Sequence, residues 1–160
     1  KIKVTKNLTV DGYLNKFLSD IFEAMKMEVT VHMQIDEEKR SISIDLEGNE
    51  MGVLIGKRGQ TLDSLQLLVN NAVHKNFETY YKVKIDTENY RVRRKETLEN
   101  LAKNVAYKVK RTKHSVTLEP MNPFERRVIH SALQNDKYVM THSEGDEPFR
   151  HIVVSLKRQN

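Results

Sequence analysis

A glycine-flanked turn between two apolar segments, Gly56-Lys57-Arg58-Gly59, constrains the fold of this chain more than any other feature. An apolar run ends at Gly56, and a segment with helical periodicity begins at Gln60. Glycines at both ends allow a sharp turn and the close approach of a ligand backbone. The free N–H groups and the positive dipole end of the second helix face the same place. With its two cations, the segment from Gly56 to Gln60 is therefore predicted to bind phosphodiester.

Two nucleotide-binding loops do not match this turn. A Walker A loop needs Gly, four residues and then Gly-Lys-Ser/Thr, but only three residues separate Gly52 from Gly56, and Arg58 replaces the hydroxyl. A Rossmann fingerprint needs Gly-x-Gly-x-x-Gly after a strand, and the glycines here have the wrong first spacing. The remaining alternative is an ordinary turn between two helices whose charges are merely solvated.

The segments around the turn predict a small α+β unit. Asp11 is expected to cap an amphipathic helix, and two alternating segments joined by a polar link are expected to form a hairpin. The expected elements, in order, are a helix over 11–25, strands over 28–35 and 41–46, helices over 49–55 and 60–77, and a strand over 81–86. The expected inner stripe of the second long helix is Leu62, Leu65, Leu68, Val69, Ala72 and Val73. Residues 1–10 are expected to be a tail or the last strand of a preceding domain.

This order of elements, with Gly-x-x-Gly between two helices, resembles the KH domain in its bacterial, type II arrangement. The resemblance implies that the loop Gly56–Gly59 clamps the backbone of about four nucleotides of an unpaired strand. The apolar flanks would then pack the two helices, and the cations would meet phosphate.

The second half predicts another small α+β unit. A long basic helix is expected over 88–111, with Leu98, Leu101, Ala102, Val105 and Val109 on its inner stripe. Asn122 and Pro123 are expected to start a helix, and strands are expected over 115–120, 137–143 and 149–156. Neither half alternates strand and helix regularly, so two small α+β domains are predicted, at 11–86 and 87–160. The long helix, which no flexible linker precedes, is expected to be a stiff spacer.

The excess positive charge is local. The chain has 27 Lys and Arg against 22 Asp and Glu, a formal net charge of +5. The segment 91–113 carries +7 and the remainder −2, which indicates a polyanion-binding patch better than the net charge does. Near the end of the long helix, Lys108, Lys110 and Arg111 either continue a phosphate track or only complement the helix dipole.

Arg126 and His130 are four residues apart and so share one helix face, with Arg127 beside them. Alone, this pattern fits a surface arginine and a half-buried histidine. The segments "EPMNPFERRVIHSALQ" and "THSEGDEPFRHIVV", however, closely resemble the R-x-x-x-H domain, a small module that binds single-stranded nucleic acid. The motif residues of that domain fall on Arg126 and His130, and its second element falls on Ser143, Gly145, Pro148 and Arg150.

A KH domain followed by this module resembles the bacterial Jag family, also called SpoIIIJ-associated or KhpB proteins, over residues 11 to 157. The resemblance implies a non-catalytic protein that binds single-stranded RNA, with single-stranded DNA left open. It also implies a regulatory role in membrane-protein insertion or the cell envelope. It leaves open a protein partner, through the KH domain or a domain preceding Lys1.

Other functions are less well supported by the residues. Cysteine is absent and His130 has no second ligand at metal spacing, so no metal or cofactor is expected. A nuclease would depend on the acidic residues Asp45, Glu47 and Glu50, and an adaptor whose RNA binding is secondary remains the other alternative. No apolar run reaches membrane-spanning length, which favours a cytoplasmic protein without membrane insertion. Tryptophan is absent and most Phe and Tyr are expected in the core, so phosphate contacts should dominate affinity.

Overall fold

The computed structural model describes residues 9–158, and the chain divides into two compact units between Arg91 and Val92. The tail or strand expected for residues 1–10 lies outside the described residues up to residue 8, and Val10 already belongs to the first helix. No helix within residues 9–158 combines the length and the apolar character that crossing a bilayer requires.

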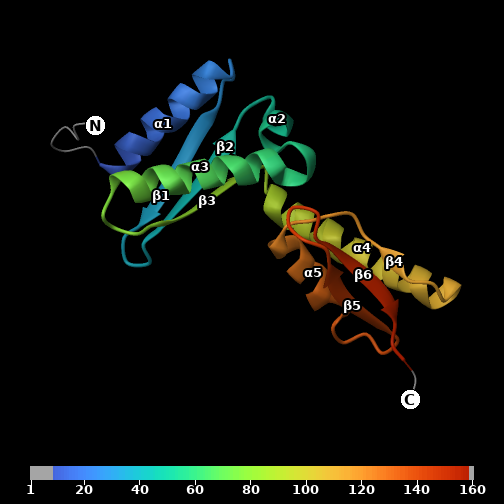
Figure 1. Ribbon diagram of the computed structural model, residues 1–160. Helices are drawn as coiled ribbons and strands as arrows, with labels where there is room; N and C mark the ends of the chain where they lie inside the picture. The colour runs from blue at the N-terminus through green and yellow to red at the C-terminus, as the bar shows by residue number, and fades with distance from the viewer. Residues whose placement is uncertain (1–8, 159–160) are drawn as a thin grey trace. The chain divides into compact units, whose positions relative to one another are not determined.

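The first unit follows the predicted order of elements (Figure 1). Its elements are α1 (Val10–Ala24), β1 (Thr30–Asp36), β2 (Ser41–Glu47), α2 (Met51–Ile55), a short 3₁₀ turn η1 (Lys57–Gly59), α3 (Gln60–Asn76) and β3 (Lys82–Thr87). β2 is the central strand, antiparallel to β1 and parallel to β3. A parallel pair needs a crossover, and α2, η1 and α3 supply it. The turn that carries the glycines is thus part of this crossover.

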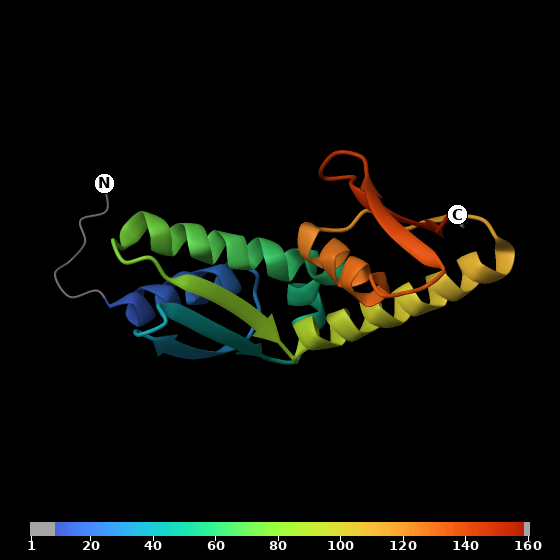
Figure 2. The same cartoon turned by 90° about the horizontal axis from the view of Figure 1, so that it is seen from below.

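The core of the first unit lies on one face of its sheet, where α1 and α3 pack (Figure 2). Alternate residues of the strands point into it, so Ile42, Ile44 and Leu46 of β2 are buried, whereas the residue that follows each of them is exposed. The opposite face presents polar side chains, among them His32, which pairs with Glu47 at 2.9 Å.

Two local expectations for the first unit are wrong. The cap of α1 is Thr9, whose hydroxyl accepts a hydrogen bond from the Gly12 N–H at 3.4 Å, and Asp11 lies in the first turn instead. Leu68 is 53% exposed and Ala72 half-buried, because the buried stripe of α3 is narrower than predicted. That stripe consists of Leu62, Leu65, Val69 and Val73.

The second unit contains most of α4 (Tyr90–Thr112), then β4 (Val116–Thr117), α5 (Pro123–Leu133), β5 (Val139–Glu144) and β6 (His151–Leu156). β6 is the central strand and is antiparallel to both neighbours. α4 and α5 pack on one face of this sheet. The architecture is therefore α+β in both units, as predicted.

The predicted start of α5 is confirmed. Asn122 accepts a hydrogen bond from the Glu125 N–H at 2.8 Å, and Pro123 occupies the first helical position. Two details differ from the prediction. β4 has only two residues, and on α4 Ala106 is buried where Leu101 is 37% exposed.

Candidate nucleic-acid interface

The loop between α2 and α3 has a left-handed backbone at three of its four residues. φ is 70° at Gly56, 54° at Arg58 and 75° at Gly59. Gly56 ends α2 by donating to the Gly52 carbonyl at 2.9 Å, and Gly59 precedes α3 without a side-chain cap. The Gln60 N–H donates back to the Lys57 carbonyl, and the positive dipole end of α3 lies at the loop. Lys57 and Gln60 are exposed, whereas Arg58 is half-buried.

Neither loop glycine has room for a side chain. A Cβ at Gly56 would overlap the hydroxyl of Thr61, and a Cβ at Gly59 would overlap the ring of Tyr90. Positive φ adds strain for any other residue. Glycine at 56 and 59 is thus required both by the backbone and by these two neighbours.

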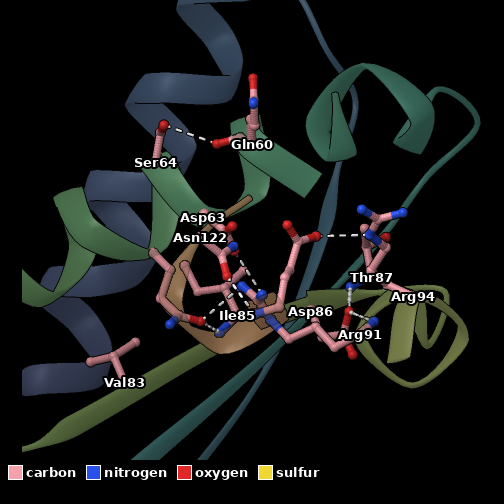
Figure 3. Close-up of polar contacts among 12 residues, drawn as sticks. Gln60, Asp63, Ser64, Val83, Ile85, Asp86, Thr87, Arg91, Arg94 and Asn122 are labelled. Atoms are coloured by element: carbon pink, nitrogen blue, oxygen red, sulfur yellow. Dashed lines mark hydrogen bonds and ion pairs between the residues drawn. The ribbon is translucent and has the colours of Figure 1, made fainter. Parts of the chain in front are cut away.

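Tyr90 and Arg91, the first two residues of α4, hold this loop and α3 in place. The Arg91 guanidinium donates to Asp63 Oδ1 at 2.7 Å and to the Ile85 carbonyl at 2.9 Å (Figure 3). It also donates to Gln66 Oε1 at 3.1 Å. These bonds join α4 to α3 and β3. Sequence reasoning counted Arg91 only as part of the basic patch and missed Tyr90. Their partners are distant in sequence, so no local pattern indicates these contacts.

Several cations of the long helix are held in internal pairs. Arg94 Nε lies 2.8 Å from Glu125 Oε1 in the second unit, and Lys110 Nζ lies 2.6 Å from Asp136 Oδ2. Burial opposes ionisation of Asp136, but hydrogen bonds from Lys110 and two backbone N–H groups lower its pKa below the ordinary value. Lys108 and Arg111, by contrast, are exposed. Of the predicted track, Lys110 is therefore the residue least free to meet phosphate.

Arg126 is only 8% exposed and holds the loop between β5 and β6. Its Nη1 donates to the Met121 carbonyl at 2.6 Å, and its Nη2 pairs with the carboxylate of Glu147. Arg150 braces the same loop, donating from Nη1 to the Gly145 carbonyl at 2.7 Å. Arg126 and Arg150, two of the predicted site residues, thus shape the loop beside α5.

His130 is half-buried between α5 and β5. Its Nδ1 lies 2.6 Å from the Thr141 hydroxyl and its Nε2 lies 3.1 Å from the Ser143 hydroxyl. In a neutral ring one nitrogen donates and the other accepts, and each hydroxyl can take either role. Burial, and to a lesser extent Arg126 and His142, lower the pKa of His130 below its ordinary value. The lowered pKa favours the neutral form of the ring at pH 7.

A groove of about 410 Å³ lies beside His130, and Arg127 supplies its exposed cation at one side. Lys157 reaches the same groove from the end of β6, with Nζ donating to the Asp136 carbonyl at 2.5 Å. Sequence reasoning predicted Arg127 but missed Lys157, which stands outside the motif. The accessible cations of this face are thus Arg127 and Lys157, not Arg126.

The acidic residues weighed for a nuclease do not assemble a site in the described part of the chain. Asp45 and Glu47 lie on the exposed face of β2, and Glu50 precedes α2. Among residues 9–158, no group of three or more His, Cys, Asp and Glu side chains could hold a metal ion.

Six of the eleven aromatic rings lie in or against the core of the first unit, as expected; they are Tyr13, Phe17, Phe22, Phe77, Tyr81 and Tyr90. The other five are more than half exposed. They are Tyr80, Tyr107, Phe124, Tyr138 and Phe149. These five rings are therefore exposed surfaces of the kind on which a nucleic-acid base stacks.

Both halves of the chain match known domain families. Residues 13–85 match the KH domain of KhpA and KhpB, and residues 96–156 match the R-x-x-x-H domain. An RNA-binding protein KhpB from Clostridium symbiosum is 58% identical over 159 residues, covering 99% of this chain and 72% of that protein. The chain belongs to the KhpB family.

Other KhpB proteins show the same relationship. The RNA-binding protein KhpB of Bacillus subtilis is 41% identical over 161 residues, covering 98% of this chain and 76% of the relative. The one from Streptococcus pneumoniae is 31% identical, and this chain covers 48% of its length. The KhpB, or Jag, resemblance found in the motifs is thereby confirmed. The domain limits of 11–86 and 87–160 stay a prediction.

Proposed function

We propose that this protein binds single-stranded RNA without catalysis, at the loop Gly56–Gly59 and at the exposed face of α5. The observation that carries the proposal is the loop itself. Three residues with positive φ turn the chain, the positive dipole end of α3 lies at the turn, and Lys57 is exposed there. Such an arrangement favours an anionic backbone that approaches closely.

The relatives support RNA as the ligand, because each matched KhpB protein is named an RNA-binding protein. In the second unit, Arg127 and Lys157 would contact phosphate, and the neutral His130 would offer hydrogen bonds instead of charge. Arg126 and Arg150 would act as positioning residues that hold the β5–β6 loop. Lys108 and Arg111 would add exposed cations along α4.

The test is a charge reversal in the loop, Lys57→Asp with Arg58→Asp, measured by fluorescence polarisation with labelled single-stranded RNA. Loss of two phosphate contacts should reduce the salt slope of binding by about 1.4, at roughly 0.7 per contact. The matched control is Lys82→Asp with Lys84→Asp, which reverses two exposed cations on β3 of the same unit. Equal affinity of the folded loop variant and the wild type would refute the loop assignment.

A second candidate, an adaptor that binds another protein, is favoured by one observation. Val53, Leu67 and Leu68 are apolar, more than half exposed, and lie on α2 and α3. Glutamate at Leu67 and Leu68 should then abolish co-purification of a protein partner while RNA affinity stays unchanged. A loss of RNA affinity alone would count against the adaptor.

The family also suggests a place for RNA binding in regulation of the cell envelope or of membrane-protein insertion, in a cytoplasmic protein. Crosslinking to RNA in cells, followed by sequencing, should recover defined transcripts of envelope proteins. For the nuclease alternative, labelled RNA incubated with the protein and Mg²⁺ should remain intact.

A further inference from the structure

A second groove lies on the other side of Arg127, between α4 and α5. It has a volume of about 550 Å³ and is here called the Phe124 groove. From α4 it is lined by Lys95, Glu99 and Lys103, and from α5 by Phe124, Arg127, Val128, Ser131 and Ala132. All of these residues belong to the second unit. The R-x-x-x-H motif contributes neither its arginine nor its histidine to this groove.

Phe124 presents an aromatic surface to the groove. It follows the capped start of α5, where Asn122 and Pro123 fix the backbone, and its side chain is 52% exposed. A ring placed on a rigid helix loses little conformational entropy when a flat ligand stacks on it. Purine and pyrimidine bases are the flat groups that single-stranded RNA supplies.

The charges of the groove favour an anion beside that ring. Lys95 and Lys103 stand two helical turns apart on α4, about 12 Å along its axis. Lys95 lies 3.9 Å from Glu99, whereas no described carboxylate pairs with Lys103 or Arg127. Three cations against one carboxylate around an aromatic ring match a nucleotide, whose base is apolar on its faces and whose phosphates are anionic.

Arg127 and Ser131 line both this groove and the groove beside His130. The two grooves are therefore neighbours on α5. We propose that the Phe124 groove binds one nucleotide of a single-stranded RNA, with its base stacked on Phe124 and its flanking phosphates on Lys95, Lys103 and Arg127. The strand then continues over Arg127 toward His130. This inference rests on the proposed RNA-binding function and adds a base-stacking subsite to it.

The first test uses the absence of tryptophan from the chain. Phe124→Trp places a single indole in the groove, and stacking of a base on it should quench its fluorescence. The probe is an oligouridylate of about 12 nucleotides. Quenching should follow the same titration curve as fluorescence polarisation of the labelled strand. The matched control is Tyr80→Trp, at an exposed aromatic position of the first unit, and it should show no quenching.

The second test measures affinity. Phe124→Ala should weaken binding of the same strand by about five- to a hundredfold, the range expected for loss of one stacked base. Phe124→Tyr, which keeps a ring, should restore affinity to within a few-fold of the wild type. Lys103→Gln should lower the salt slope by about 0.7. The melting temperature of each variant shows whether the fold is retained.

The outcomes separate this inference from the function beneath it. If Phe124→Ala binds RNA as tightly as the wild type while the Lys57/Arg58 reversal weakens binding, the subsite is wrong and the RNA-binding function stands. If the intact chain binds no RNA at all, the proposed function itself fails. If polyglutamate quenches the fluorescence of the Phe124→Trp variant as strongly as RNA does, the groove recognises acidic peptide and the nucleotide assignment is overturned.

Discussion

Gly56 and Gly59 are required by different neighbours. Thr61, which crowds Gly56, belongs to the first turn of α3, so this constraint is local. Tyr90, which crowds Gly59, begins α4 and lies 31 residues away in sequence. The shape of the loop Gly56–Gly59 therefore depends on a side chain that no motif in the loop would indicate.

Valine at either glycine should lower both stability and RNA affinity. Left-handed backbone strain costs about 1–3 kcal/mol, and overlap with Thr61 or Tyr90 adds to it. A unit of this size would melt about 4–8 °C lower per kcal/mol. The matched control is Gly52→Ala on α2, where a Cβ meets nothing within 4 Å. Calorimetry that finds Gly56→Val and Gly59→Val as stable as Gly52→Ala would contradict the steric argument.

Arg126 and Arg127 are adjacent, yet their substitution should have opposite consequences. Arg126→Gln leaves the Met121 carbonyl and Glu147 without their partner, so stability should fall by about 1–3 kcal/mol. Arg127→Gln changes an exposed side chain, so stability should stay within about 0.5 kcal/mol while RNA affinity drops. Urea unfolding and polarisation on both variants measure the difference. A stable Arg126→Gln variant would show that this arginine is not a positioning residue.

His130 should make the stability of the second unit depend on pH. The pKa of His130 is lower in the folded than in the unfolded state. At pH values between these two pKa values, the unfolded chain therefore binds more protons than the folded chain. Its contribution to stability is therefore complete above the ordinary histidine pKa of about 6.5 and is lost as pH falls toward the lowered value. Unfolding of the wild type and of His130→Gln, compared from neutral pH down to about 5, should show a smaller loss in the variant. Parallel pH profiles would exclude this histidine as the cause.

At the scale of the elements, the sequence predicted the order because hydrophobic periodicity is a local signal. α3 and α4 were placed within a few residues of their observed ends. Periodicity does not show how wide a buried stripe is, so Leu68 and Leu101 were wrongly assigned to the core. Periodicity also does not show which charged side chains pair with each other. Arg94 meets Glu125 across 31 residues, and Lys110 meets Asp136 across 26.

The pair of Arg94 and Glu125 joins α4 to α5, with side chains only 19% and 7% exposed. Removing one partner from a buried pair leaves an uncompensated charge and costs about 3–5 kcal/mol, whereas replacing both with apolar residues costs much less. Arg94→Met and Glu125→Leu should therefore each destabilise the second unit more than the double variant does. A double-mutant cycle in urea measures this. Additive effects would mean that the two side chains do not interact.

At the scale of the whole chain, the motifs identified the candidate site better than they assigned roles within it. Lys57 and Arg127 are exposed where ligand contact requires it, but Arg126 is buried. A motif shows which residues occur together. It does not show whether each of them contacts the ligand or holds its neighbours in place. The basic patch had the same ambiguity, because Arg91, Arg94 and Lys110 are paired internally. Its formal charge therefore overstates the number of phosphates it can neutralise.

Two RNA-binding modules on one chain should bind long strands much more tightly than short ones. Once one module holds the strand, the other meets it at a high effective concentration, and affinity can rise by about 10²–10⁴-fold where the geometry allows both to engage. The measurement is polarisation with strands of about 4 to about 16 nucleotides. The proteins compared are the wild type, the Lys57→Asp/Arg58→Asp variant and Arg127→Glu.

The wild type should gain affinity steeply with length, because a strand of about four nucleotides occupies one module, whereas a long strand can engage both. Each variant keeps one module intact and should gain little. Whole-chain variants are preferable to a cut near Asp86, because that cut would separate Tyr90 and Arg91 from the loop they brace. If either variant binds the long strand as tightly as the wild type, the modules do not cooperate and the unaltered one carries the function alone.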